Sequence, residues 1–186
     1  LHAIPIATYV FAQILRTIKS IDDHIELQRQ KNWKQMMSVG ELTDMTIGIT
    51  GFGGIGQEIA RLAKAFRMKV FATKRTPVLS DNLDRLFKPS ELNEMLALCD
   101  FVVNCLPSSE DTYKVFSKEQ FQSMQSSAMF INVGRGESVD EQSLADALVK
   151  RDIAFAALDT TDPEPLDSNS PLWTLDNCFI TPHDSA

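Results

Sequence analysis

The sequence predicts an α/β fold, a doubly wound parallel sheet with helices on both faces. Two features predict it: six short apolar runs, and helical stretches between them. The runs span 46–50, 69–73, 101–105, 128–132, 153–158 and 178–181. Their length and their content of Ile, Val and Phe are typical of buried strands. Because a strand reaches a parallel neighbour through a crossover helix, this alternation favours parallel pairing.

The helical stretches are recognised by apolar residues that fall on one face. The first such face consists of Ile6, Val10, Ile14 and Ile18. Their spacing of four predicts a long opening helix. Residues 22–35 predict a second, more polar helix, and Gly40 ends that pattern. Later helices are expected around 55–66, 92–96 and 144–148.

Composition and charge restrict the classes of partner. The chain has 186 residues, 44% of them hydrophobic, so it can bury one core. A formal net charge of -7 argues against nucleic acid and against an anionic membrane as partners. The three cysteines lack CxxC spacing, which indicates neither a disulfide framework nor a zinc site. With no apolar stretch of about 18 residues, we expect a soluble, cytoplasmic domain that acts on small molecules and holds no metal.

A glycine turn follows the first predicted strand and opens the next helix. It reads Gly51, Phe52, Gly53, Gly54, Ile55, Gly56. In such a GxGxxG turn the first glycine permits the bend, the second lets the backbone approach a pyrophosphate, and the third lets helix and strand pack closely. The helix start offers N–H groups to the phosphates. The turn therefore predicts a Rossmann-like dinucleotide site, with a ligand-free glycine turn as the alternative.

The end of the second strand bears on the choice of cofactor. An NAD site places a carboxylate there to accept the ribose 2'-hydroxyl. This strand instead ends Thr73, Lys74, Arg75, Thr76. Two cations suit a 2'-phosphate, because ammonium and guanidinium groups pair with phosphate oxygens. We expect NADP in preference to NAD; the alternative is that Lys74 and Arg75 are a solvated strand end.

Further motifs carry a family resemblance. They are Asn132-Val133-Gly134-Arg135-Gly136, Val139-Asp140-Glu141, Leu158-Asp159, Pro163-Glu164-Pro165 and Thr181-Pro182-His183. In order and spacing they resemble the D-isomer-specific 2-hydroxyacid dehydrogenase family, from His2 to Ala186. The resemblance implies the NAD(P)-binding domain of an oxidoreductase that transfers a hydride between NAD(P)H and a 2-oxo acid or D-2-hydroxy acid.

The resemblance also implies three catalytic residues, Arg135, Glu164 and His183. A guanidinium can hold the substrate carboxylate and polarise the reacting carbonyl. Imidazole can exchange a proton with the alkoxide near neutral pH. A carboxylate on the other ring nitrogen would orient the imidazole and favour its charged form. Singly, each residue has a plain alternative: a surface-loop arginine, a glutamate in a rigid turn, a solvated histidine.

Cofactor contacts are implied at the same sheet edge. By resemblance, Asp159 would accept a hydrogen bond from the nicotinamide carboxamide; its alternative is a turn or cap residue. Backbone and apolar contacts are expected from Cys105, Leu106, Pro107, Val133 and Gly134. Cys105 has no histidine pattern that would make it a nucleophile. Asp140 is expected to cap a helix and not to bind metal.

Members of this family normally carry a second, substrate-binding domain. The chain begins without methionine and ends three residues after His183, so we expect a fragment, 1–186, that lacks that domain. Residues 45–183 would form the Rossmann core, and residues 1–40 helices for interdomain contact or dimerisation. We expect cofactor binding, little turnover, and a homodimer formed through an exposed apolar face of the opening helix.

Two functions remain open. The first is the oxidoreductase, with glyoxylate, hydroxypyruvate or a bulkier 2-oxo acid as substrate. The second is a non-catalytic dinucleotide-sensing module of the corepressor kind, since some relatives of this type keep the same three residues. Lys74 and Arg75 favour the reductase, because reductive enzymes commonly use NADPH.

Overall fold

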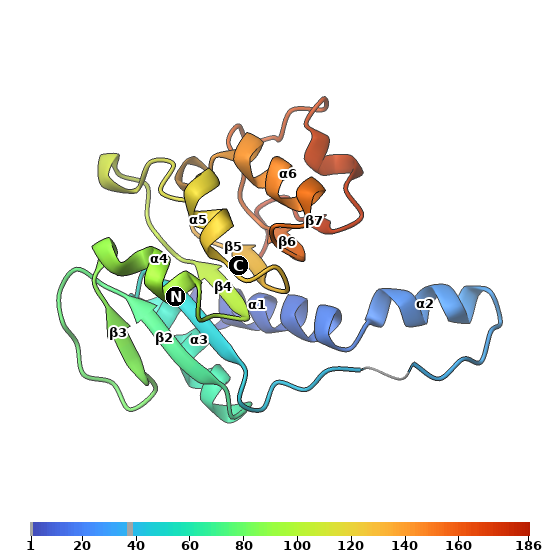
Figure 1. The fold of residues 1–186 in the computed structure, drawn as a ribbon, viewed down its shortest axis with the longest axis horizontal. Coiled ribbons are helices and arrows are strands. Elements are labelled where there is room, and N and C mark those ends of the chain that lie inside the picture. The colour runs from blue at the N-terminus through green and yellow to red at the C-terminus, as the bar shows by residue number, and fades with distance from the viewer. Residues whose placement is uncertain (1, 37–38) are drawn as a thin grey trace.

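A computed structural model describes residues 2–36 and 39–186 and shows one parallel sheet, in the order β3-β2-β1-β4-β5-β6-β7 (Figure 1). The strands are β1 (Thr46–Thr50), β2 (Lys69–Thr73), β3 (Arg85–Phe87), β4 (Phe101–Asn104), β5 (Met129–Asn132), β6 (Phe155–Leu158) and β7 (Cys178–Ile180). The chain starts at the centre of the sheet, runs out to β3, and returns to the other side of β1. The predicted doubly wound sheet is confirmed.

The register aligns the carboxyl ends of the central strands. Thr50 pairs with Thr73 on one side and with Asn104 on the other. Asn104 in turn pairs with Asn132, and Asn132 with Leu158. The loops that follow these strands therefore leave from one edge, where ligands bind in folds of this kind.

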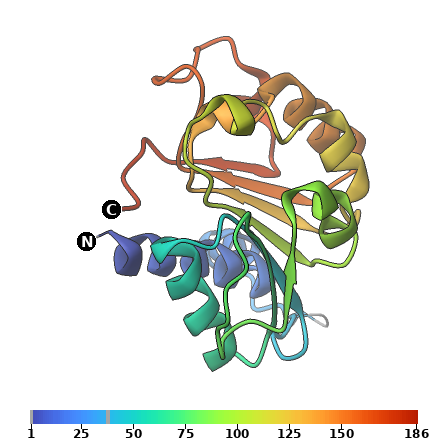
Figure 2. The same ribbon diagram turned by 90° about the vertical axis from the view of Figure 1, so that its left-hand side faces the viewer.

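Helices cover both faces of the sheet (Figure 2). They are α1 (Ala3–Ile18), α2 (Ile21–Arg29), α3 (Gly54–Ala65), α4 (Leu92–Leu96), α5 (Lys118–Ser123) and α6 (Glu141–Lys150). Residues of α1 and α3 share one core cluster, and residues of α4, α5 and α6 share another. Alternate strand residues serve the two cores: Val103 packs in the first and Val102 in the second.

The structure adds two elements that the apolar pattern does not predict. Strand β3 has three residues, Arg85 to Phe87, and lies at the edge of the sheet. It is too short and too polar at its start to stand out as an apolar run. Helix α5 has six residues and one buried apolar side chain, Phe121, so it shows no repeating stripe.

The expectation that α1 exposes an apolar face is wrong. Ile6, Val10 and Ile14 are buried. Helix α1 packs on α3, and Phe11 stacks on Phe66 with ring centroids 5.1 Å apart. A one-sided stripe predicts burial but does not identify the element that covers it, and here the covering element belongs to the same domain.

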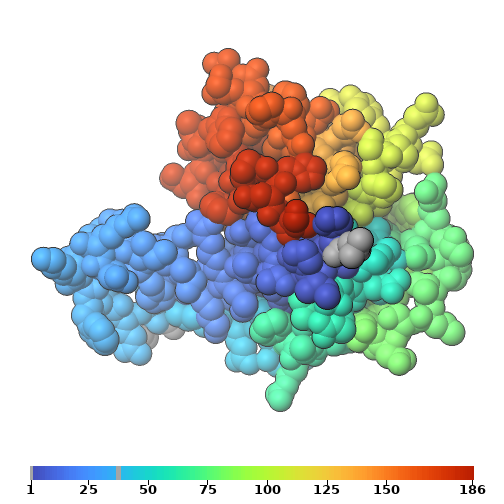
Figure 3. Space-filling model, turned by 180° about the vertical axis from the view of Figure 1, so that it is seen from behind, coloured from blue at the N-terminus to red at the C-terminus, as the bar shows by residue number. Residues whose placement is uncertain are grey.

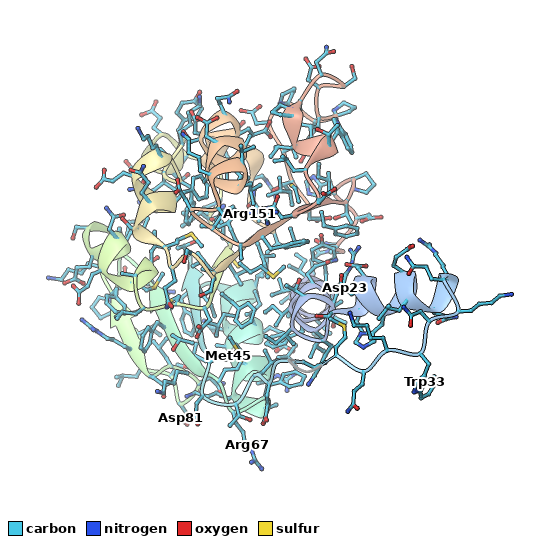
Figure 4. The ribbon with its side chains drawn as sticks, turned by 45° about the vertical axis from the view of Figure 1, so that its right-hand side comes forward. Asp23, Trp33, Met45, Arg67, Asp81 and Arg151 are labelled. Carbon is cyan, nitrogen blue, oxygen red and sulfur yellow. The ribbon has the colours of Figure 1, made fainter. Side chains whose placement is uncertain are left out.

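Exposed apolar residues lie instead on α2 and the segment after it. Helix α2 ends at Arg29, earlier than expected, and none of its residues is buried. It projects from the rest of the molecule (Figure 3, light blue). Ile21, Ile25 and Trp33 are exposed, and Trp33 lies well away from the sheet (Figure 4). No helix formed by residues 2–36 and 39–186 is both long and apolar enough to cross a membrane.

Candidate active site

The glycine turn between β1 and α3 has the geometry that its sequence predicts. Gly51 has a φ of 90°, a conformation that side chains disfavour. A Cβ on Gly56 would lie 2.5 Å from the Gly51 carbonyl oxygen, so helix and turn touch there. A Cβ on Gly53 or Gly54 would meet nothing within 4 Å. The outer side of the turn is therefore open.

The start of α3 can receive an anion. Gly53 is the N-cap, and no side chain caps the helix. The first N–H groups of a helix lack intrahelical partners and carry partial positive charge. Ile55, next in the turn, packs against the first core and anchors the helix start. Open space in front of uncapped N–H groups suits a pyrophosphate.

A cavity of about 420 Å³ lies beside this turn. Its walls are the glycine turn, the end of β2 and the loop after β4. Of the predicted cofactor residues, Gly51, Gly53, Thr73, Lys74, Arg75, Cys105, Leu106 and Pro107 line it. Gly54, Ile55, Gly56, Val133, Gly134 and Asp159 do not. The cavity thus brings together three loops at the sheet edge where the sequence predicts the cofactor contacts.

Both cations of the β2 end line this cavity. Lys74 Nζ donates a hydrogen bond to the carbonyl oxygen of Phe52 (2.7 Å) and so connects the end of β2 to the glycine turn. Arg75 Nη1 lies 3.1 Å from Asp111 Oδ2, and both side chains are largely exposed. Asp111 also lines the cavity. No motif in the sequence draws attention to this carboxylate.

Burial decides the character of Cys105. It raises the pKa of the Cys105 thiol to about 12. The side chain therefore stays a thiol at neutral pH, and a thiol is a poor nucleophile. Cys105 is a wall of the cavity, as the sequence indicates.

Arg135 leaves the loop after β5. Its side chain is exposed, and Nη1 donates to the Gly134 carbonyl oxygen (2.8 Å). The next residue, Gly136, is buried. A Cβ on Gly136 would overlap the carbonyl group of Thr161. Glycine thus lets the Arg135 loop press against the loop that carries Glu164.

A buried amide, Asn104, ties the central loops together. Its Nδ2 donates to Asn132 Oδ1 (2.9 Å) and to Ser138 Oγ (2.6 Å). Its Oδ1 accepts from Thr50 Oγ1 (3.2 Å) and from Leu106 N (3.1 Å). All four hydrogen-bonding positions of the amide are therefore used.

The network continues to Arg135 itself. Ser138 Oγ donates to the Arg135 carbonyl oxygen (2.6 Å), and Gly134 N donates to Asn132 Oδ1 (3.2 Å). Asn132 Nδ2 reaches the Thr160 carbonyl oxygen (3.2 Å) in the loop after β6. Sequence reasoning overlooked Asn104, Asn132 and Ser138 as positioning residues. An available signal was an asparagine at or next to the end of two of the apolar runs, 101–105 and 128–132.

Glu164 and His183 form a pair. His183 Nδ1 lies 2.9 Å from Glu164 Oε2, and both side chains are about half exposed. Glu164 Oε1 also accepts from Thr161 N (3.2 Å). Nε2 of His183 has no partner within the described part of the chain, which leaves it for proton exchange. The pair lines a second cavity, of about 460 Å³.

Asp159 lines the same cavity but is itself only 2% exposed. Its Oδ1 accepts from Thr181 Oγ1 (2.7 Å) and Asp184 N (3.1 Å), and its Oδ2 from Ser185 N (3.2 Å). The carboxylate therefore binds the segment on either side of His183. This role as a loop anchor matches the alternative of a turn or cap residue.

Asp140 is the N-cap of α6, as predicted, because its Oδ1 accepts from Ser143 N (2.9 Å). Within residues 2–36 and 39–186, no group of three or more His, Cys, Asp or Glu side chains is arranged to hold a metal ion.

The predicted residues thus divide into two neighbouring sites on one edge. The glycine-turn cavity lies at β1, β2 and β4, and the Glu164–His183 pair follows β6 and β7. Arg135 follows β5, which lies between them in the sheet. Its guanidinium bonds its own backbone and does not bond the pair. One edge therefore offers a helix start that can receive an anion, an imidazole that can exchange a proton and an exposed guanidinium.

Comparison with known proteins identifies the family of this chain. Residues 11–185 match the family model described as D-isomer specific 2-hydroxyacid dehydrogenase, NAD binding domain. Human glyoxylate reductase/hydroxypyruvate reductase is 38% identical over 175 residues, which cover 91% of this chain and 53% of that protein. The chain spans about half the length of the curated relatives it matches.

Solved structures share the fold. A D-isomer specific 2-hydroxyacid dehydrogenase family protein from Aeromonas salmonicida has a TM-score of 0.96 at 34% identity. The match covers 100% of this chain and 60% of the Aeromonas chain. A probable 2-hydroxyacid dehydrogenase from Rhizobium etli, in complex with NADP, has a TM-score of 0.91 at 31% identity. The match covers 99% of this chain and 59% of the Rhizobium chain. The chain belongs to the D-isomer specific 2-hydroxyacid dehydrogenase family and is its NAD binding domain.

Proposed function

We propose that this chain is the cofactor half of a reductase that transfers a hydride from NADPH to a small 2-oxo acid and releases a D-2-hydroxy acid. The observation that carries the proposal is the Glu164–His183 pair, 2.9 Å apart, on the sheet edge that also holds the glycine-turn cavity. The names of the relatives, glyoxylate and hydroxypyruvate reductases, favour this reductase over a non-catalytic sensing module and suggest its substrates.

Three residues of this chain would act on the substrate. When bound, the reduced nicotinamide supplies the hydride that forms the new C–H bond at C2. Nε2 of His183 gives its proton to the carbonyl oxygen as that oxygen gains charge. Glu164, bonded to Nδ1, stabilises the imidazolium before transfer and fixes the ring. Arg135 holds the substrate carboxylate through paired hydrogen bonds.

We propose NADP as the preferred cofactor because Lys74 and Arg75 line the cavity and no carboxylate ends β2. The structure of the Rhizobium relative with NADP supports this choice. We would titrate the chain with NADPH and with NADH by calorimetry. Lys74→Asp and Arg75→Asp should each weaken NADPH binding about tenfold or more relative to NADH, the loss expected when a charge-assisted hydrogen bond is replaced by repulsion.

A matched control is Arg29→Asp, which makes the same charge change on α2, away from the cavity. It should leave the NADPH to NADH ratio unchanged. If the cavity variants also leave the ratio unchanged, the phosphate site at the end of β2 is refuted.

We further propose that catalysis needs a substrate-binding domain in the part of the relatives that this chain does not span. His183 and Glu164 are half exposed, and water competes with substrate in an open site. The chain alone should bind cofactor but oxidise NADPH with glyoxylate or hydroxypyruvate far below the usual enzymatic rate of about 10 per second. Turnover near that rate would contradict this.

We propose that the chain forms a homodimer through α2 and the segment after it, where Ile21, Ile25 and Trp33 are exposed. Exposed apolar groups of this kind mark contact surfaces. Light scattering should show a dimer that becomes a monomer when Ile25 and Trp33 are changed to Ser. A monomer before any change would contradict the proposed dimer.

We also propose that the protein works in the cytoplasm, a reducing compartment, because its three cysteines are free.

A further inference from the structure

One side chain of α1 reaches the segment that carries His183. Tyr9 OH lies 2.8 Å from Thr181 Oγ1, although 172 residues separate them in sequence. The last residues of the chain, red in Figure 3, lie against the start of α1, dark blue. The contact therefore joins the first helix to the end of the last strand.

The direction of the hydrogen bonds follows from the proton count. A threonine hydroxyl has one proton, and Thr181 Oγ1 donates it to Asp159 Oδ1 (2.7 Å). Tyr9 must then donate to Thr181. Burial raises the pKa of Tyr9 to about 12, so the phenol keeps this proton at neutral pH. Two successive hydrogen bonds therefore run in one direction, from Tyr9 to Thr181 and from Thr181 to the buried Asp159 carboxylate.

The same carboxylate holds the backbone beyond His183. Asp184 N and Ser185 N both donate to Asp159, so the segment 181–185 folds around one acceptor. His183, in the middle, has a φ of 55°. Such a left-handed conformation is unfavourable for a residue with a Cβ and persists only where its surroundings impose it. The three hydrogen bonds to Asp159 and the bond from His183 to Glu164 are part of those surroundings.

We propose that Tyr9 is a positioning residue for His183. Its hydroxyl fixes Thr181, which keeps Asp159 oriented toward the Asp184 and Ser185 amides and thereby presents the imidazole to Glu164. Helix α1 also packs on α3, whose start is the glycine turn. Tyr9 thus sets the position of the proton donor relative to the helix that faces the cofactor. This inference rests on the proposed role of His183.

The test uses Tyr9→Phe, which removes one hydroxyl, and nuclear magnetic resonance of the histidine rings. The chain has three histidines, so His2 and His24 are internal references. We expect the His183 ring nitrogen shifts to change and exchange of the Asp184 and Ser185 amides to rise about fivefold, the effect of losing one ordinary hydrogen bond. His2 and His24 should keep their spectra.

Two further variants separate positioning from general destabilisation. Thr181→Val removes the bonds to both Tyr9 and Asp159, so it should change the same signals at least as much as Tyr9→Phe. Thr181→Ser keeps the hydroxyl and should keep the original signals. The double variant Tyr9→Phe, Thr181→Val should add nothing to Thr181→Val alone. Tyr113→Phe, at the other tyrosine, should change none of these signals. An unchanged His183 ring and unchanged amide exchange in Tyr9→Phe would overturn the proposal whatever Thr181→Val shows, as would a uniform rise in exchange across the whole chain.

The outcome also separates this inference from the proposed function. If a full-length protein containing this domain reduces no 2-oxo acid but Tyr9→Phe still alters the His183 ring, the positioning stands and the reductase assignment fails. If the protein is an active reductase and Tyr9→Phe leaves the His183 ring unaffected, the reductase assignment stands and the positioning role of Tyr9 fails.

Discussion

The loops that carry Arg135 and His183 leave the same edge of the sheet but are held by different chemistry. The Arg135 loop follows a central strand and rests on neutral groups, Asn104, Asn132 and Ser138, which are at most 1% exposed. The His183 segment follows β7, an edge strand with only half-buried residues, and rests on one carboxylate, Asp159. The central loop is held by hydrogen bonds to several neutral side chains, whereas three hydrogen bonds of the edge segment end on one carboxylate.

The largest expected effect comes from removing the centre of the shared network. Asn104→Leu removes the four hydrogen bonds that this amide makes, to Thr50, Leu106 N, Asn132 and Ser138. It should lower the free energy of unfolding by roughly 3–5 kcal/mol, because buried polar groups lose hydrogen bonds together. Urea denaturation followed by circular dichroism measures this.

The control for this variant is Asn169→Leu at an exposed loop position, which should change stability by less than about 0.5 kcal/mol. If Asn104→Leu costs no more than Asn169→Leu, the central loop does not depend on the amide network and the contrast between the two loops disappears.

Two glycines test how the loops are coupled. Gly136→Ala forces a Cβ into the Thr161 carbonyl group and should cost about 2–3 kcal/mol, as overpacking does. It should also change the His183 ring signals, because the Glu164 loop must move. Gly53→Ala adds a methyl group that meets no protein atom within 4 Å but lies at the cavity. Stability should hold while NADPH binding weakens about tenfold, since the second glycine of the turn is where the backbone approaches the phosphates.

Denaturation and calorimetry on the two glycine variants check this contrast. An equal loss of stability in the two variants would mean that protein atoms fill the space on the outer side of the glycine turn. Unchanged cofactor binding in Gly53→Ala would place the pyrophosphate elsewhere.

A smaller and more local effect is expected at the edge. Asp159→Asn keeps the shape but removes the charge that accepts from Asp184 N and Ser185 N. Amide exchange of these two residues should rise by an amount equivalent to about 1–2 kcal/mol, while Gly134 N in the central loop stays protected. Asp167→Asn, in an exposed loop, is the control. Exchange that rises equally at Gly134 would show that the two loops are one unit.

More of the glycine-turn site than of the Glu164–His183 site could be predicted from local sequence patterns. The strands and the glycine turn were predictable because apolar runs and Gly51 and Gly56 record local requirements of burial and backbone conformation. The Glu164–His183 pair came from the family resemblance, since nothing local joins positions 19 residues apart. The donors to Asp159 could not be predicted, because two of the three are backbone amides and amides are present at nearly every residue.

The same limit explains the errors. The stripe on α1 was read correctly as apolar, but its partner α3 becomes a neighbour only after β1 and β2 pair. Asn104 and Asn132 each end a strand, and only the register places them side by side. Patterns along the chain record which residues are buried, whereas the identity of their partners depends on the topology of the sheet.

The smallest effect concerns the outer end of the central loop, where one ionic contact occurs. The Ser143 N–H and the Lys114 ammonium hold the pKa of Asp140 below its usual value. A carboxylate whose pKa is lower in the folded state stabilises the fold above its unfolded pKa, near about 4, and loses that effect as pH falls through the folded value. Asp140→Ala should cost about 1 kcal/mol at pH 7, and the difference from the unchanged chain should shrink below about pH 4.

Asp140→Asn sharpens this prediction, because asparagine also caps helices but carries no charge. It should retain most of the stability at pH 7 and lose the acid dependence that Asp140 contributes. Asp146→Ala, an exposed position on the same helix, controls for the loss of any carboxylate on α6. If Asp140→Ala remains equally destabilising at pH 7 and at pH 3, the cap acts through its shape alone, and the Arg135 loop is held by neutral contacts along its whole length.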